Sequence, residues 1–198
     1  MLTNDGSAKP SGSSSATRPQ AQRTPQKISA WALGPESWSV ATAEEDLTVR
    51  LWDLRTSALR AALPGHSARV HELAFSADGR LLASAGAERG IRLWDTERGL
   101  LLDTLRGHGD VAHGLSFSAD GARLLSASSD GSARIWSLQG GQHLLRLGHP
   151  QAVTAATYSP DGRHVATASK DPLARVFDAE TGQPVAALAL PDEVSAVA

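Results

Sequence analysis

A structural unit repeats along this chain at a nearly fixed spacing, and this periodicity constrains the fold more than any local pattern does. Each unit closes with an aromatic residue, and the closing residues are 42, 42 and 41 positions apart: Trp52, Trp94, Trp136 and Phe177. Each unit also carries a hydroxyl side chain ten residues before the aromatic and an acid six residues before it. The last three units carry a His 28 residues before it. We therefore expect one supersecondary motif to be used several times.

Short apolar runs separated by turn residues fill every unit, which is typical of antiparallel strands. The first unit is predicted to have strands at 28–33, 40–43, 48–54 and 59–63, and the later units repeat this order. Asp-Gly pairs follow the first strand of the later units and suit tight hairpins, because Gly adopts positive φ angles at little cost. No window shows the 3.6-residue period of a helix. The prediction is an all-β fold.

The recurring polar residues are predicted to form one buried network per unit. The acid can accept a hydrogen bond from the His ring, the His can bond the hydroxyl, and the hydroxyl can accept from the indole N–H. The residues of these sets are His66, Ser84, Glu88 and Trp94; His108, Ser126, Asp130 and Trp136; His149, Thr167 and Asp171; and Thr42, Asp46 and Trp52. The first unit has Thr24 in place of the His, and Phe177 has no N–H, so these two networks are expected to be the weaker ones.

Gly-His pairs at 65–66, 107–108 and 148–149 and Trp-Asp pairs at 52–53 and 94–95 make the chain from residue 27 onward resemble the WD-repeat (β-transducin-like) propeller family. The resemblance implies a WD-repeat β-propeller with one four-stranded antiparallel blade per repeat around a central channel. It places four blades at about 27–64, 65–106, 107–147 and 148–190, with residues 191–198 as the first strand of a fifth. Such a ring is incomplete.

The two ends of the chain differ in character. Residues 1–26 are rich in Ser, Pro and Gln and lack the apolar run of a secretory signal, so a disordered leader is expected there. The sequence stops inside the predicted fifth blade, which suggests a fragment of a longer array, although Met1 favours a chain that begins here. With no Cys and a net charge of −2, we expect a cytoplasmic protein without disulfides, nucleic-acid partners or membrane contact.

The recurring Ser, His and acid residues are also compatible with chemistry other than a structural role. Ser, His and an acid that meet in space also occur in hydrolases, but here the set recurs, and the hydroxyl is expected to face an indole. No catalytic, metal-binding or cofactor-binding residue is therefore predicted, and the chain is not expected to be an enzyme. Arginines on the third strands are expected to pack through their stems, with an anionic ligand near the channel as the alternative: Arg50, Arg92, Arg134 and Arg175.

Function is expected on one rim of the blades, because rigid sheets with variable loops are common recognition platforms. The family resemblance places these positions at the entry to the first strand and just before the acid. They are Arg69, His71, Ala87, Val111, His113, Ser129, Ala152, Thr154, Lys170 and Glu45. They vary between units while the network does not. The opposing interpretation is an unconstrained surface.

The predicted function is a non-catalytic scaffold that binds a protein or peptide partner through this rim. The alternative is a regulatory or sensor segment of a larger signalling enzyme, a kinase or nucleotide-binding protein, whose catalytic domain lies outside this chain. Uncovered end blades also predict self-association or completion of the ring by another chain, because repeat arrays need neighbours to cover their apolar faces. A truncated product without function is a third hypothesis.

Overall fold

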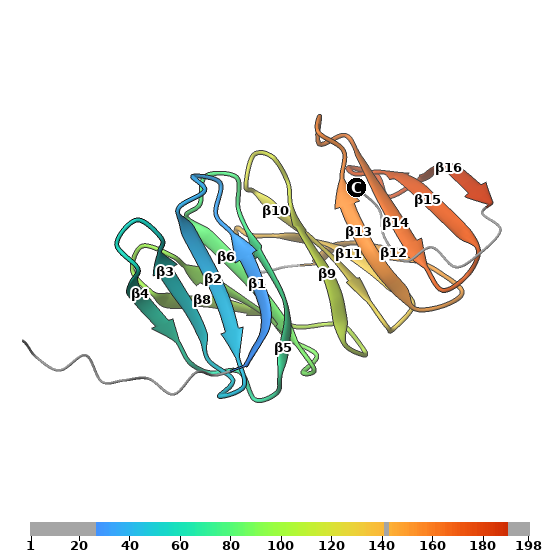
Figure 1. Cartoon of the computed structure of the whole chain (residues 1–198). Helices are drawn as coiled ribbons and strands as arrows, with labels where there is room; N and C mark the ends of the chain where they lie inside the picture. The colour runs from blue at the N-terminus through green and yellow to red at the C-terminus, as the bar shows by residue number, and fades with distance from the viewer. Residues whose placement is uncertain (1–26, 141–142, 190–198) are drawn as a thin grey trace, which may run out of the picture.

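The computed structural model describes residues 27–140 and 143–189, and these form four separate four-stranded sheets, here called blades 1 to 4 (Figure 1). Within each blade, consecutive strands pair antiparallel in chain order. The strands are β1 (Ile28–Leu33), β2 (Ser39–Glu44), β3 (Val49–Asp53) and β4 (Ala58–Leu63); β5 (Val70–Phe75), β6 (Leu81–Gly86), β7 (Ile91–Asp95) and β8 (Leu100–Leu105); β9 (Ala112–Phe117), β10 (Arg123–Ser128), β11 (Ser132–Ser137) and β12 (His143–Gly148); and β13 (Val153–Tyr158), β14 (His164–Ser169), β15 (Leu173–Asp178) and β16 (Pro184–Ala189).

The all-β prediction is confirmed, and in the first unit each strand begins and ends within one residue of its expected limits. The Asp-Gly hairpins also form. In the turn after β5, Asp78 Oδ1 accepts hydrogen bonds from Ser76 Oγ (2.6 Å) and the N–H of Arg80 (3.0 Å). Gly79 adopts a φ of 71° there, which only glycine reaches without strain.

The blades follow one another around an arc, and blades 1 and 4 lie at its two ends, so the ring is not closed (Figure 1). The first strands β1, β5, β9 and β13 lie side by side on the inner edge of this arc. The predicted leader, Thr24 and the predicted fifth-blade strand lie outside the described residues. In the described part of the chain, no helix is long and apolar enough to cross a membrane.

The hydrophobic core lies between the blades, where each blade packs its third- and fourth-strand side chains against the next. Between blades 1 and 2, for example, Val49, Leu51 and Leu63 meet Leu73 and Trp94. Equivalent clusters join blade 2 to blade 3 and blade 3 to blade 4. Burial of apolar surface at these contacts is the main stabilising term, so each blade depends on its neighbours.

Candidate functional site

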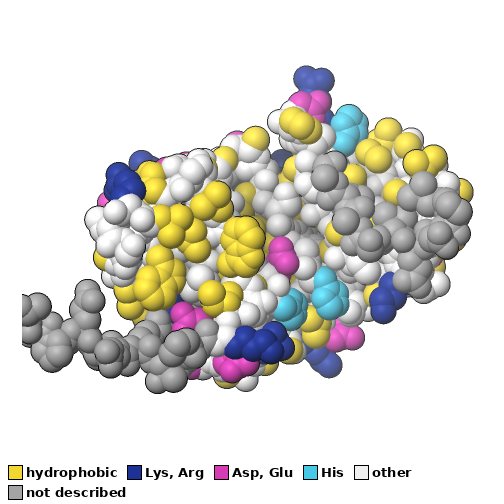
Figure 2. Space-filling model, in the orientation of Figure 1, with side chains coloured by type: hydrophobic (Ala, Val, Ile, Leu, Met, Phe, Trp, Pro, Cys, Tyr) yellow, Lys and Arg dark blue, Asp and Glu magenta, His cyan; other side chains and the backbone are white. Residues whose placement is uncertain are grey.

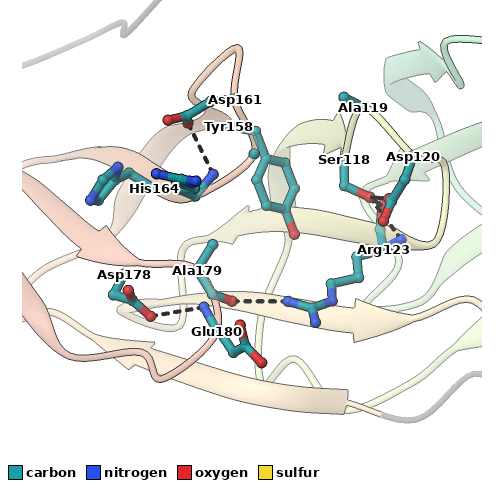
Figure 3. A pocket seen from close by; sticks show the side chains of 12 residues that line it. Ser118, Ala119, Asp120, Arg123, Tyr158, Asp161, His164, Asp178, Ala179 and Glu180 are labelled. Carbon is teal, nitrogen blue, oxygen red and sulfur yellow. Dashed lines mark hydrogen bonds between the residues drawn. The ribbon is translucent and has the colours of Figure 1, made fainter.

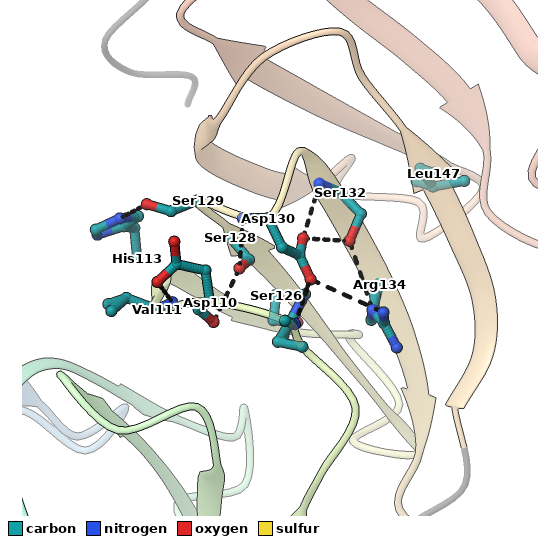
Figure 4. Close-up of polar contacts among 12 residues, drawn as sticks. Asp110, Val111, His113, Ser126, Ser128, Ser129, Asp130, Ser132, Arg134 and Leu147 are labelled. Carbon is teal, nitrogen blue, oxygen red and sulfur yellow. Dashed lines mark hydrogen bonds and ion pairs between the residues drawn. The ribbon is translucent and has the colours of Figure 1, made fainter.

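Blade 3 contains the full predicted network. Trp136 Nε1 donates to Ser126 Oγ (2.8 Å), Ser126 Oγ lies 2.7 Å from His108 Nε2, and His108 Nδ1 lies 2.9 Å from Asp130 Oδ2. A neutral His108 with its proton on Nδ1 satisfies all three contacts, since Ser126 then donates to Nε2. Figure 4 shows Asp130 between Ser126, Ser132 and Arg134, at the end of β10. The network therefore ties the turn before β11 to the entry of the blade.

Glycine before the His makes room for this network. Gly107 has a φ of 153°, and a Cβ there would lie 2.8 Å from Arg134 Nη1 and 3.3 Å from Trp136 Cη2. Any other residue would be strained at this φ, and its side chain would displace the guanidinium of Arg134 and crowd the ring of Trp136. The Gly-His pair is thus a packing requirement rather than a binding motif.

Blade 2 has the same residues except for Glu88, and the extra methylene changes the contact. His66 Nε2 and Trp94 Nε1 each lie 2.7 Å from Ser84 Oγ, as in blade 3. His66 Nδ1 lies 3.0 Å from Glu88 Oε1, but the approach lacks hydrogen-bond geometry and the nitrogen is buried without a hydrogen-bond partner among the described residues. Glu88 accepts from the N–H of Ser67 (2.6 Å), as Asp130 accepts from the N–H of Gly109, and also from Ser67 Oγ (2.7 Å).

Blade 4 departs from the predicted network. His149 Nε2 reaches Thr167 Oγ1 (2.8 Å), but His149 Nδ1 contacts the carbonyl oxygen of Leu147 (3.1 Å) instead of the acid. Asp171 pairs with Arg175 through both carboxylate oxygens (2.9 and 2.8 Å). The expectation that Asp171 accepts from His149 is therefore not met. The backbone also differs at this point, because Gly148 does not share the positive φ of Gly65 and Gly107.

In blade 1 the described part of the network consists of an arginine, two acids, a hydroxyl and an indole. Arg50 is buried and lies between Asp46, with bonds of 2.9 and 2.5 Å, and Glu44 at 3.0 Å. The predicted bond between the indole and the hydroxyl is present, since Trp52 Nε1 donates to Thr42 Oγ1 (2.8 Å).

Sequence reasoning missed the role of the third-strand arginines. In every blade the guanidinium lies near the acid four residues earlier: Arg50 near Asp46, Arg92 near Glu88 (3.0 Å), Arg134 near Asp130 (3.8 Å) and Arg175 near Asp171. A constant acid-to-arginine spacing of four residues was the available signal. These pairs bring the arginines to the acids of their own blades.

Burial sets the protonation of the network. Burial lowers the pKa of His66 to about 4 against the opposing charge of Glu88, and it also lowers the pKa of His108 and of His149. Burial alone would raise the pKa of Glu88, but the hydrogen bonds from Ser67 outweigh it and hold the value at about 2. The rings are therefore neutral and the acids ionised near neutral pH.

The arrangement of Ser126, His108 and Asp130 has the order of a hydrolase triad but lacks access for a substrate. Ser84 and Ser126 are both 0% exposed, and each hydroxyl already accepts from an indole N–H. A nucleophile must reach the reacting carbon, which a fully buried hydroxyl cannot do. The network therefore acts as a structural clamp on the turn between the second and third strands.

The predicted rim residues are brought together in pairs by the backbone. In blades 2 to 4, the N–H of the residue before the acid donates to the carbonyl of the residue before the first strand at 2.9 Å, and the corresponding bond in blade 1 is 3.2 Å. These bonds run from Ala87 to Arg69, Ser129 to Val111, Lys170 to Ala152 and Glu45 to Lys27. Of the predicted positions, Arg69, Ala87, His113, Lys170 and Glu45 are exposed and the others are half-buried.

Two imidazoles from neighbouring blades stack on this rim. The rings of His71 on β5 and His113 on β9 lie 5.5 Å apart between centroids at an interplanar angle of 26°. His113 Nε2 lies 2.6 Å from Ser129 Oγ, and Figure 4 shows this contact at the edge of blade 3. Burial and the adjacent His113 lower the pKa of His71. Blades 1 and 4 carry Ser29 and Thr154 at this position, so the aromatic pair is confined to blades 2 and 3.

The opposite rim has a cavity of about 560 Å³ between blades 3 and 4 (Figure 3). Its lining includes Arg123, whose Nη1 donates to the carbonyl oxygen of Ala179 (3.2 Å), and turn carboxylates such as Asp120 that bond their own backbone. The hydroxyl of Tyr158 is buried without a hydrogen-bond partner among the described residues. Burial raises the pKa of Tyr158 to about 12. Within residues 27–140 and 143–189, no group of three or more His, Asp or Glu side chains is arranged to hold a metal ion.

Comparison with known proteins gives matches to one repeat family. The family model described as "WD domain, G-beta repeat" matches residues 57–95, 99–137 and 141–178, which together cover more than half of the chain. Each matched unit begins near the fourth strand of one blade and ends in the third strand of the next. A sequence repeat therefore contributes strands to two neighbouring blades.

Two curated relatives match shorter segments. Coronin-7 from Mus musculus is 50% identical over 44 residues, which is 22% of this chain and 5% of that protein. Coronin-7 from Homo sapiens is 42% identical over 59 residues, which is 29% of this chain and 6% of that protein. The matched segments thus span only a small part of these relatives.

Proposed function

This chain belongs to the WD-repeat family, and from that premise we propose that it is a non-catalytic scaffold that binds a protein or peptide partner through the rim carrying His71 and His113. WD repeats generally mediate protein–protein interaction. The Ser, His and acid sets are buried structural clamps, and this supports a binding role without chemistry of its own.

The observation that carries the choice of rim is the contrast between a constant backbone and changing side chains. The same backbone hydrogen bond holds each pair of rim positions, yet the residues presented are Arg and Ala, Val and Ser, or Ala and Lys. A rigid frame with variable side chains is what selective recognition requires. The exposed imidazole of His113, stacked on the half-buried ring of His71, adds an aromatic group to this rim, a type of group well suited to an interface.

The test uses the full chain as bait in cell extract of the source organism, followed by an affinity measurement with the purified partner. Arg69→Ala combined with His113→Ala alters the proposed rim. Arg163→Ala combined with His164→Ala is the matched control, because it removes the same residue types from the opposite rim. We expect the rim variant to lose the partner and the control to retain it. Equal binding by both variants would refute the choice of rim.

A further inference from the structure

The first strand of blade 1 exposes its apolar residues. Blades 2 to 4 bury the residues at the same repeat positions against the preceding blade. Trp31 is 68% exposed, whereas its counterparts are 6%, 8% and 7% exposed in the next three blades: Leu73, Leu115 and Ala156. Ile28 is likewise 52% exposed, whereas its counterpart in blade 2, Val70, is 0% exposed. Figure 2 shows hydrophobic side chains gathered over the blade formed by β1–β4. We call this surface the front face.

Blade 4 exposes the other half of the same contact. Leu188 on β16 is 62% exposed, whereas its counterparts are 0%, 1% and 2% exposed because the following blade covers them: Leu63, Leu105 and Leu147. Ala174 and Val176 on β15 are only half-buried, although the residues at their positions in blades 1 to 3 are buried. We call this surface the back face.

A single added strand cannot cover the back face. Inside the chain, the turn between the third and fourth strands of the following blade covers the counterpart of Leu188. A Cβ at Gly182 would lie 3.3 Å from Leu147 Cδ2, and a Cβ at Gly99 would lie 3.8 Å from Leu63 Cδ2. Leu188 therefore needs the outer turn of a following blade to cover it.

Blade 1 carries the turn that this contact needs. Ser57 occupies the repeat position of Gly99 and Gly182 and has a φ of 56°, close to their values of 66° and 71°. Blade 1 therefore presents both the apolar first strand and the turn conformation with which blades 2 and 4 cover their predecessors.

We propose that the front face of one copy packs against the back face of a second copy, in both directions, so that two chains close one ring. Four blades from each copy give eight, which lies within the usual range for propellers. A head-to-tail contact of this kind closes when its rotation completes a circle and otherwise continues into open fibres. The proposal does not depend on the rim function proposed above.

Sedimentation velocity of the full 198-residue chain tests the proposal. We expect twice the monomer mass at about 50 µM protein, since association scales with concentration. Trp31→Arg and Leu188→Arg should each weaken the dimer by about a hundredfold, because an unpaired guanidinium is strongly disfavoured in an apolar contact. Val185→Arg is the matched control: Val185 lies at the irregularity in the pairing of β15 with β16, is 57% exposed, and corresponds to Arg60 in the first unit.

Mixing the two disruptive variants tests whether the front face of one copy contacts the back face of the other. A Trp31→Arg copy keeps its back face and a Leu188→Arg copy keeps its front face, so an equimolar mixture should recover dimers through one contact while each variant alone stays monomeric. Circular dichroism and thermal melting confirm that both variants are folded. A monomeric wild type, open polymers, or a Leu188→Arg variant that still associates while Trp31→Arg does not would overturn the proposal.

Discussion

His108 and Asp130 are joined by a hydrogen bond of 2.9 Å between Nδ1 and Oδ2, whereas His66 and Glu88 lie 3.0 Å apart without hydrogen-bond geometry. The difference between the two blades is one methylene group in the acid. Asp130 Oδ2 accepts from both the His108 ring and the N–H of Gly109, whereas Glu88 accepts from the equivalent N–H of Ser67 and from its hydroxyl through Oε2, with Oε1 facing His66 Nδ1. The stability of each blade therefore depends on how its acid is placed.

Replacement of Asp130 by Ala is expected to destabilise the protein more than replacement of Asp46 by Ala. Asp130 accepts from His108, from the N–H of Gly109 and from Ser132, so its loss leaves buried donors unpaired at a cost of about 2–3 kcal/mol. Asp46 is more exposed, and Arg50 keeps its contact with Glu44 when Asp46 is removed. Urea denaturation of both variants measures the difference. Equal losses would contradict the assigned role of Asp130.

Replacement of Glu88 by Asp is expected to stabilise blade 2. The shorter side chain would place its carboxylate as Asp130 is placed, so His66 Nδ1 gains an acceptor worth about 0.5–1.5 kcal/mol. Thermal melting measures the gain, and nitrogen-15 NMR of the His66 ring reports whether Nδ1 becomes hydrogen-bonded. A lower melting temperature with an unchanged ring signal would contradict this prediction.

The repeat made most of the fold predictable from the sequence. Strand limits followed from turn residues and apolar runs, and the pairing of His108 with Ser126 and Trp136 followed from constant spacing, because each repeat folds into the same supersecondary unit. The hydrogen-bond partner of each acid could not be predicted from this spacing. Asp130 bonds His108, whereas Asp171 bonds Arg175 and His149 turns to the carbonyl oxygen of Leu147, although the residue spacing is the same.

The pairing of the third-strand arginines with the acids could be predicted only in part. Arg50 and Asp46 are four residues apart, as are the corresponding pairs in the other units, but residue spacing does not reveal that the turn folds back to bring the two charges together. The stacking of His71 on His113 was also hidden, since it requires knowing that β5 and β9 lie side by side.

Replacement of Glu72 by Gln is expected to stabilise the protein at pH 8 and to have little effect at pH 4. Burial raises the pKa of Glu72 to about 7, and no hydrogen bond or ion pair joins its side chain to another described residue. Between pH 4.5 and 7 the folded state holds a proton that the unfolded state releases, so wild-type stability falls as pH rises through this window. Because the side chain is only half-buried, the gain at pH 8 is on the order of 1 kcal/mol.

Urea denaturation of the wild type and the Glu72→Gln variant across this pH range measures the effect. The difference between the two should grow from pH 4 to pH 8. A difference that stays constant with pH would show that the side chain of Glu72 is fully hydrated and would contradict the prediction.

Replacement of Tyr158 by Phe is expected to raise the free energy of unfolding by about 1 kcal/mol, because it removes a buried hydroxyl without a partner. The corresponding positions in blades 2 and 3 already carry Phe75 and Phe117. Tyr158 is the single tyrosine of the chain, so near-ultraviolet absorbance follows its ionisation directly. The midpoint should lie near pH 12 in the folded protein and near 10 in urea, with stability falling as pH rises between the two values. A midpoint of 10 in the folded protein together with a destabilised Phe variant would show that the hydroxyl is hydrated.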